Sequence, residues 1–252
     1  MTQPYVTLRS GVDMPLLGFG TWQLSGRKGY DAIRTALSAG YRHIDTATMY
    51  ANEAEVGRAL RDSGIQREEI FITTKVQADR AGRERETINA SLRDLGVSHV
   101  DLWLIHWPPR HGAPAMWQQL MRARDEGLTR AIGVSNFSLA QIDELDEVPT
   151  VNQIPWSPFD YDAALVTGLD KRGVVLEGYS PFKRSDLRNK VLASIADAHG
   201  VSPAQVILRW HIQHGFVAIP KSSTPDRIAG NLDIFGFELS ADEMARVDAL
   251  GS

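Results

Sequence analysis

Short apolar runs alternate with amphipathic stretches along the chain. The runs are rich in aliphatic and β-branched residues and are bounded by Gly, Pro, Asp or Asn, which is typical of buried strands in a parallel sheet. We predict eight such strands, of which the first has the weakest pattern: Leu16–Gly20, Arg42–Ile44, Ile70–Thr74, Val100–Ile105, Ala131–Val134, Val148–Gln153, Val174–Gly178 and Val217–Pro220.

The stretches between these runs carry apolar residues at helical spacing. In Tyr30–Ala39, residues Ala32, Ile33, Ala36 and Leu37 fall on one face of a helix. Further helices are predicted at Ala54–Leu60, Thr87–Leu95, Ala115–Met121, Leu139–Leu145, Ala163–Leu169 and Ala241–Leu250. Glycines follow many of these segments, where helices commonly end. Alternating strands and helices predict an α/β fold with a parallel sheet, but periodicity leaves a closed barrel and an open doubly wound sheet both possible.

The segment before the first strand predicts a small hairpin. Tyr5–Leu17 has Ser10–Gly11 at its turn, and such a hairpin would suit the bottom of a barrel. The length of 252 residues fits one (β/α)8 barrel, which needs roughly 250 residues. We therefore expect a single domain over residues 1–252.

Composition narrows the class of protein. A net charge of −4 with scattered basic residues favours neither nucleic acid nor an anionic membrane as a partner. The chain has no cysteine, which excludes disulfides, Cys-ligated zinc, iron–sulfur clusters and thiol nucleophiles. No apolar stretch approaches the roughly 20 residues of a membrane span, and Met1–Ser10 does not resemble a secretory signal. We expect a cytoplasmic protein.

Four polar side chains follow three consecutive predicted strands. Asp45 and Tyr50 come after the second strand, Lys75 ends the third and His106 follows the fourth. Catalytic side chains of a (β/α)8 barrel lie at the carboxyl ends of its strands. A lysine ammonium beside a phenol lowers the phenol pKa, and a carboxylate would keep that lysine charged. A histidine could then donate a hydrogen bond to a substrate oxygen.

Each of these residues also has a structural explanation. Asp45 could be a helix N-cap, Tyr50 a half-buried aromatic, Lys75 part of a rim salt bridge and His106 a core histidine with its hydrogen bonds satisfied. Their joint occurrence on adjacent strand ends favours catalysis. A barrel hydrolase or lyase would need paired acids or a metal cluster, and no His, Asp and Glu residues stand at metal-ligand spacing.

The chain resembles the aldo-keto reductases, in particular the short bacterial members of the diketogluconate/methylglyoxal reductase group. Segments that carry the resemblance occur in family order along nearly the whole chain: Leu17–Trp22 (LGFGTW), Gly40–Tyr50 (GYRHIDTATMY), Ile70–Lys75 (IFITTK), Val100–Pro108 (VDLWLIHWP), Ile132–Phe137 (IGVSNF), Val151–Ile154 (VNQI), Gly178–Pro181 (GYSP) and Ile219–Asn231 (IPKSSTPDRIAGN).

The resemblance implies a TIM barrel that reduces aldehydes, ketones or dicarbonyls with NADPH. Tyr50 would be the general acid that protonates the carbonyl oxygen as hydride arrives from C4 of the nicotinamide. Lys75 would lower the Tyr50 pKa, Asp45 would pair with Lys75, and His106 would orient the carbonyl. The alternative is a non-catalytic nucleotide-binding barrel that regulates a partner protein.

A cofactor site is predicted after the last strand. A Rossmann G-x-G-x-x-G is absent, since Gln23 stands where its third glycine would be. Residues 219–225 instead suit a phosphate site at a helix N-terminus, with Thr224 as N-cap and Pro225 at the first helical position. The resemblance assigns Lys221, Ser222 and Arg227 to the 2′-phosphate, Asn231 to the adenine, Ser135, Asn136 and Gln153 to the nicotinamide amide, and Tyr179 to the nicotinamide ring, with Thr21, Ser180 and Ser223 as further contacts.

The chain departs from the family pattern in places. Gly230 replaces a glutamate that often faces the adenine, and Phe182–Lys183–Arg184 replaces the commoner Leu-Gly, which brings bases within reach of the pyrophosphate. The connections Pro108–Met116 and Phe182–Asn189 are short, and the chain stops at Ser252. We therefore expect short substrate loops and an open pocket, lined by Trp22, Tyr50 and Trp107, that accepts varied small carbonyl compounds. No metal is implied, and a monomer is expected.

Overall fold

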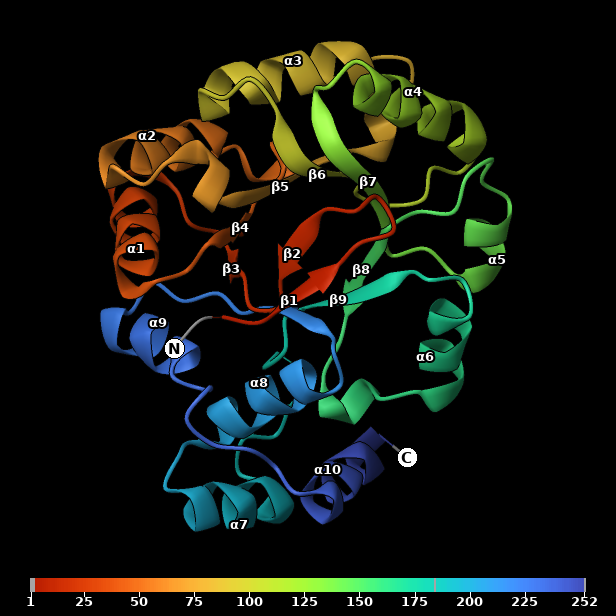
Figure 1. Ribbon diagram of the computed structural model, residues 1–252. Coiled ribbons are helices and arrows are strands. Elements are labelled where there is room, and N and C mark those ends of the chain that lie inside the picture. The colour runs from red at the N-terminus through yellow and green to blue at the C-terminus, as the bar shows by residue number, and fades with distance from the viewer. Residues whose placement is uncertain (1–2, 184, 252) are drawn as a thin grey trace.

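Eight parallel strands form a closed barrel in a computed structural model that describes residues 3–183 and 185–251 (Figure 1). Neighbouring strands pair in chain order, and the first and last meet through a parallel bridge between Leu17 and Ala218. The amide of Gly18 donates to the Ala218 carbonyl at 2.8 Å, and the Ala218 amide donates to the Leu16 carbonyl at 2.8 Å. The fold is thus a barrel, not an open doubly wound sheet. The strands are β3 (Phe19–Gly20), β4 (His43–Asp45), β5 (Phe71–Val76), β6 (Val100–Ile105), β7 (Thr129–Ser135), β8 (Val151–Pro155), β9 (Val175–Tyr179) and β10 (Val217–Ile219).

The strand predictions are confirmed, with boundary shifts of a few residues. Every residue of β5 and β6 is buried, because the barrel interior lies on one side and the helices lie on the other. Burial on both sides explains why these strands read as continuous apolar runs. It also makes a charged residue in such a strand, such as Lys75, chemically unusual.

Helices surround the barrel. The face of α1 that carries Ala32, Ile33, Ala36 and Leu37 is buried, as the spacing predicts. Gly40 ends α1 with φ at +116°, a conformation that favours glycine. The sequence pattern predicts no helix over Lys190–His199, where the structure has α7. The helices are α1 (Gly26–Ala39), α2 (Glu53–Ser63), α3 (Glu84–Leu95), α4 (Ala113–Asp125), α5 (Leu139–Asp143), α6 (Ala163–Asp170), α7 (Lys190–His199), α8 (Pro203–Gln213), α9 (Pro225–Leu232) and α10 (Ala241–Asp248).

Short 3-10 helices complete the connections. They are η1 (Thr48–Tyr50), η2 (Arg67–Glu69), η3 (Ala78–Arg80), η4 (Pro158–Asp160) and η5 (Ala249–Gly251). In residues 3–183 and 185–251, no single helix is long and apolar enough to cross a membrane, and only the pair α7 and α8, bent by 88° at its break, passes that test jointly.

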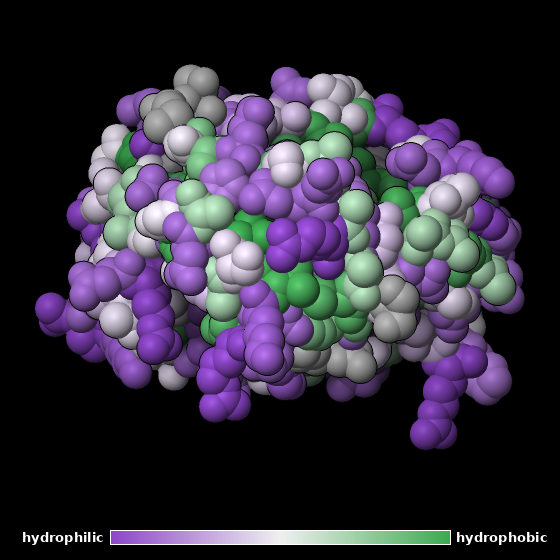
Figure 2. All heavy atoms as spheres, turned by 90° about the horizontal axis from the view of Figure 1, so that it is seen from below, coloured by the Kyte–Doolittle hydropathy of each residue, from purple (hydrophilic) through white to green (hydrophobic). Residues whose placement is uncertain are grey.

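The predicted N-terminal hairpin is present. Strands β1 (Tyr5–Thr7) and β2 (Asp13–Pro15) pair antiparallel, with Gly11 at φ +78° in the turn. In the view of Figure 1 the hairpin lies across the middle of the barrel. The Leu16 amide donates to the Pro4 carbonyl at 3.0 Å, so the hairpin lies at the amino-terminal end of the barrel strands. The side of the molecule seen in Figure 2 is mostly hydrophilic, with hydrophobic atoms gathered in a patch near its middle.

Candidate active site

Three neighbouring strands bring Asp45, Lys75 and His106 to the carboxyl rim of the barrel. Asp45 ends β4, Lys75 lies near the end of β5, and His106 directly follows β6. The pairing of β4 with β5 and of β5 with β6 makes these positions neighbours. Tyr50 reaches the same rim from η1, which follows β4. The four residues singled out in the sequence therefore come together.

Lys75 and Asp45 form a buried ion pair. The Lys75 Nζ donates to both Asp45 carboxylate oxygens at 2.7 Å and to the Thr46 carbonyl at 2.9 Å. Burial is the largest single effect and opposes the lysine charge. The negative charge and hydrogen bonds of Asp45, together with smaller contributions from Tyr50 and Glu177, nevertheless hold the pKa of Lys75 above its usual value. The N-caps of η1 and α2 are Ala47 and Asn52, so Asp45 is not a helix cap. Its carboxylate instead keeps Lys75 charged.

The Tyr50 hydroxyl lies 3.5 Å from the Lys75 Nζ. Burial raises the pKa of Tyr50, while the charge of Lys75 acts to lower it, and the balance remains above the ordinary phenol value. Lys75 thus acts in the direction expected from the sequence, but burial is the larger effect. The phenol is therefore protonated at neutral pH, and the adjacent ammonium can stabilise the phenolate that proton donation would create.

His106 stands beside Tyr50 as a neutral imidazole. The two rings meet edge to face with centroids 5.7 Å apart. Burial, aided by the charge of Lys75, lowers the pKa of His106 to about 3. A neutral imidazole carries one N–H, so His106 can donate one hydrogen bond without adding a charge to the site.

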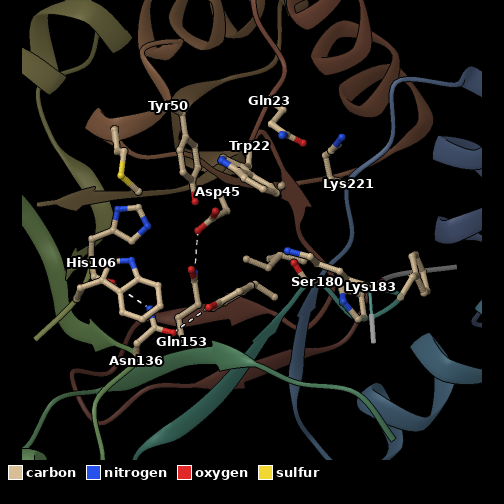
Figure 3. A pocket seen from close by; sticks show the side chains of 17 residues that line it. Trp22, Gln23, Asp45, Tyr50, His106, Asn136, Gln153, Ser180, Lys183 and Lys221 are labelled. Carbon is tan, nitrogen blue, oxygen red and sulfur yellow. Dashed lines mark hydrogen bonds between the residues drawn. The ribbon is translucent and has the colours of Figure 1, made fainter. Parts of the chain in front are cut away.

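A pocket of about 530 Å³ opens over these groups (Figure 3). Asp45, Tyr50 and His106 line its inner end. Trp22, Met49 and Trp107 line it as well, and these side chains are 44%, 47% and 49% exposed. Such exposure of large apolar side chains is typical of a binding surface rather than of packing. The pocket therefore combines apolar walls with polar groups that converge at one end, as small-molecule sites do.

The residues expected at the nicotinamide are also connected to this pocket. The Tyr179 hydroxyl donates to the Asn136 side-chain oxygen at 2.9 Å, and the Gln153 amide donates to Asp45 at 2.8 Å. Asn136, Gln153, Tyr179 and Ser180 line the pocket. Ser135 and Thr21 do not line it, because both are buried behind its wall. Their hydroxyls donate to the backbone carbonyls of Gln153 and Asp45 respectively.

The residues expected at the adenosine phosphate run from the edge of the pocket into α9. Lys221 lines the pocket, and Ser222, Ser223, Arg227 and Asn231 follow it in the loop and on α9. Thr224 occupies the N-cap position but its side chain makes no capping hydrogen bond. Within the described residues, Lys221 and Arg227 form no ion pair with an acidic side chain. Free cations beside a helix N-terminus fit the chemistry of a phosphate.

A second cation, Lys183, also lines the pocket. Its Nζ lies 5.7 Å from the centroid of the Trp22 ring. Gly20 also lines the pocket, and a Cβ there would come within 3.2 Å of the Ile219 carbonyl oxygen, so this position packs closely against the end of β10. Arg184, the other base noted in the sequence, lies outside the described residues. The described residues therefore fit a dinucleotide whose phosphates lie towards α9.

Strained backbone gathers around the pocket. Among the described residues, four that are not glycine have positive φ: Gln23, Ala51, Asn136 and Ser180. Gln23, Asn136 and Ser180 line the pocket, and Ala51 follows Tyr50. Such conformations cost free energy and tend to gather at functional sites. Sequence reasoning could not find them, because only Asn among these residue types commonly adopts positive φ.

Sequence reasoning also missed Glu177, which is fully buried in β9. An acid within the apolar run Val174–Gly178 was the available signal. In residues 3–183 and 185–251, no group of three or more His, Cys, Asp or Glu residues could hold a metal ion.

Comparisons of sequence and of structure with known proteins point to the same family. The model of the Aldo/keto reductase family matches residues 16–252. An aldo-keto reductase of Mycolicibacterium vanbaalenii is 44% identical over 98% of this chain and 92% of its own length. Glyoxal reductase of Bacillus subtilis is 42% identical over 97% and 92%. The crystal structure of an aldo/keto reductase from Brucella melitensis superposes with a TM-score of 0.96 at 41% identity, covering 99% of this chain and 98% of that one.

Proposed function

Because this chain belongs to the aldo/keto reductase family, we propose that it reduces aldehydes, ketones or dicarbonyls to alcohols with NADPH. The observation that carries the proposal is the Tyr50 hydroxyl 3.5 Å from Lys75, at the inner end of a pocket with apolar walls. The relationship to a glyoxal reductase supports a small carbonyl substrate. The exposed rings of Trp22 and Trp107 support a pocket that accepts varied carbonyl compounds.

The proposed reaction adds a hydride to the carbonyl carbon and a proton to the carbonyl oxygen. A bound nicotinamide cofactor would be the source of the hydride that reduces the carbonyl carbon. Tyr50 donates its hydroxyl proton to the carbonyl oxygen, so that the carbonyl becomes an alcohol and Tyr50 becomes a phenolate. Lys75, held charged by Asp45, stabilises that phenolate. His106 donates a hydrogen bond to the same oxygen and orients the carbonyl.

The cofactor would be held along the pocket and the start of α9. Asn136, Gln153 and Tyr179 would hold the nicotinamide end, while Lys183 would lie near the pyrophosphate. Lys221, Ser222 and Arg227 would bind the 2′-phosphate. The two unpaired cations near the α9 N-terminus support NADPH in preference to NADH, because the extra phosphate of NADPH needs positive charge.

The test is a reduction assay in which the absorbance of the reduced nicotinamide is followed with a panel of small, branched and aromatic carbonyl compounds. We expect NADPH oxidation with several members of the panel. Binding of NADPH without turnover of any of them would favour the non-catalytic nucleotide-binding barrel. A strong preference for one bulky polycyclic ketone would contradict the open pocket.

A further inference from the structure

Glu177 lies inside the barrel, one layer below the proposed proton-transfer group. It pairs in register with Gln153 of β8 and with Val217 of β10. Side chains two residues apart in a strand point to the same face. Glu177 therefore stands below Tyr179, just as His43 stands below Asp45. The Glu177 Oε1 lies 3.6 Å from the His43 Nε2, which places both side chains in this lower layer.

The Glu177 carboxyl is buried without the partners that a carboxylate needs. Its side chain is fully buried, and neither oxygen has a hydrogen-bond partner among the described residues. Asp45, one layer above, accepts hydrogen bonds from both Lys75 and Gln153. One lysine thus neutralises one carboxylate. A second, uncompensated carboxylate at this depth would be strongly disfavoured.

The electrostatic surroundings agree with a neutral acid. Burial, reinforced by the negative charge of Asp45, raises the pKa of Glu177 to about 8. Burial also lowers the pKa of His43 to about 3, so His43 offers no positive charge to a Glu177 carboxylate. Glu177 therefore holds its proton at neutral pH and loses it only in alkaline solution.

The groups around Glu177 determine what its ionisation would change. Strand β4 contributes His43 and Asp45, and β5 contributes Lys75. Strand β8 contributes the uncharged Gln153, and β10 contributes only apolar residues. Lys75 is the one positive charge in this set of described residues. Ionised Glu177 would place a second negative charge beneath it.

We propose that Glu177 is a positioning residue for proton transfer, a neutral acid beneath the Asp45–Lys75 pair whose ionisation changes the charge that Tyr50 experiences through Lys75. This inference rests on the proposed function. Beyond the larger effect of burial on Tyr50, a charge on Glu177 raises the pKa of the phenol. Tyr50 then keeps its proton at higher pH. The ionised acid thus favours the phenol needed for carbonyl reduction over the phenolate needed for alcohol oxidation.

Kinetics in the oxidative direction test the proposal. The pH dependence of kcat/KM for alcohol oxidation with NADP⁺ is measured for the wild type, Glu177→Gln and Glu177→Asp. Gln is nearly isosteric and cannot ionise, so we expect the apparent pKa of the phenolate-dependent limb to fall by about one pH unit, the scale expected for a charge removed near a buried group. Asp retains an ionisable carboxyl and should keep the wild-type profile. Coincident profiles for folded wild type and Glu177→Gln would overturn the proposal.

Infrared spectroscopy tests the protonation state independently of activity. A difference spectrum between wild type and Glu177→Gln at pH 6.5 should contain the carbonyl stretch of a protonated carboxylic acid, and this band should disappear above pH 9. A carboxylate band at pH 6.5 would overturn the proposal. Thermal midpoints establish that each variant is folded, and Glu177→Met, which also cannot ionise, replaces Glu177→Gln in both measurements if the latter does not fold. Absence of any turnover would refute the proposed function, whereas coincident pH profiles in an active enzyme would refute only the role of Glu177.

Discussion

Lys75 Nζ lies 2.7 Å from each carboxylate oxygen of Asp45, and both side chains are buried. Removing one partner leaves the other as a buried, uncompensated charge. We therefore expect Lys75→Met to lower the free energy of unfolding by about 3–5 kcal/mol. The double variant Asp45→Leu/Lys75→Met removes both charges and should lose less than the sum of the single variants. Urea unfolding measures the free energy of unfolding of the wild type, Asp45→Leu, Lys75→Met and the double variant. A loss in the double variant equal to the sum of the two single losses would contradict a coupled pair.

Tyr50→Phe removes the proposed proton donor and keeps the ring. We expect kcat for carbonyl reduction to fall by about 10²–10⁴-fold, the range usual for a general acid. NADPH affinity, measured by fluorescence titration, should change little, because the proposed cofactor contacts come from other residues. Near wild-type turnover in this variant would assign the proton donor to another group.

Arg227→Ala tests the proposed 2′-phosphate site. Loss of one charge-assisted hydrogen bond corresponds to roughly a tenfold or greater increase in Kd, and only NADPH carries the phosphate concerned. We expect the Kd for NADPH to rise by at least about tenfold and the Kd for NADH to remain nearly constant. Arg246→Ala, at an exposed position near the end of α10, is the matched control. Equal losses for both cofactors would place the phosphate elsewhere.

Trp107→Ala tests whether the exposed indole contacts substrate. Trp107 is 49% exposed and lines the pocket beside His106. An aromatic aldehyde can bury its ring against the indole, whereas a two- or three-carbon dicarbonyl is too small to do so. We expect KM to rise several-fold for aromatic aldehydes, in line with lost apolar burial, and to change little for small dicarbonyls. Equal changes for both classes would indicate general disturbance of the rim.

The sequence predicts the strands and the ion pair for the same physical reason. Strands buried on both faces read as continuous apolar runs, so Lys75 within such a run requires a partner, and Asp45 on the neighbouring strand end supplies it. Gln153 contacts Asp45 from 108 positions along the chain, and periodicity carries no information about such a contact. The positive φ values of Gln23 and Ser180 depend on packing of the whole rim. Burial raises the pKa of Tyr50 by more than the charge of Lys75 lowers it. This balance depends on the depth of the pocket, which spacing along the chain does not reveal.

Three buried histidines should destabilise the protein in acid. Burial lowers the pKa of His43 and His106 to about 3 and that of His211 to about 4, below the usual 6.5 of an unfolded chain. The unfolded state therefore binds more protons than the folded state between these values. Their contribution to stability is fully present above pH 6.5 and is lost as pH falls towards the folded pKa values. Each histidine adds a slope of up to about 1.4 kcal/mol per pH unit.

His211→Gln isolates one of these contributions. His211 is fully buried, with its Nδ1 2.8 Å from the Ile207 carbonyl oxygen, and glutamine can retain a hydrogen bond without a proton-binding site. We expect this variant to be less stable than wild type at pH 7 and the difference to shrink as pH falls to 5, because only the wild type must keep His211 neutral. Urea unfolding at pH 7, 6 and 5 measures the difference. His111 is exposed, so the free energy of unfolding of the control variant His111→Gln should change with pH as that of the wild type does. The same pH dependence in His211→Gln and wild type would show that His211 titrates normally in the folded protein.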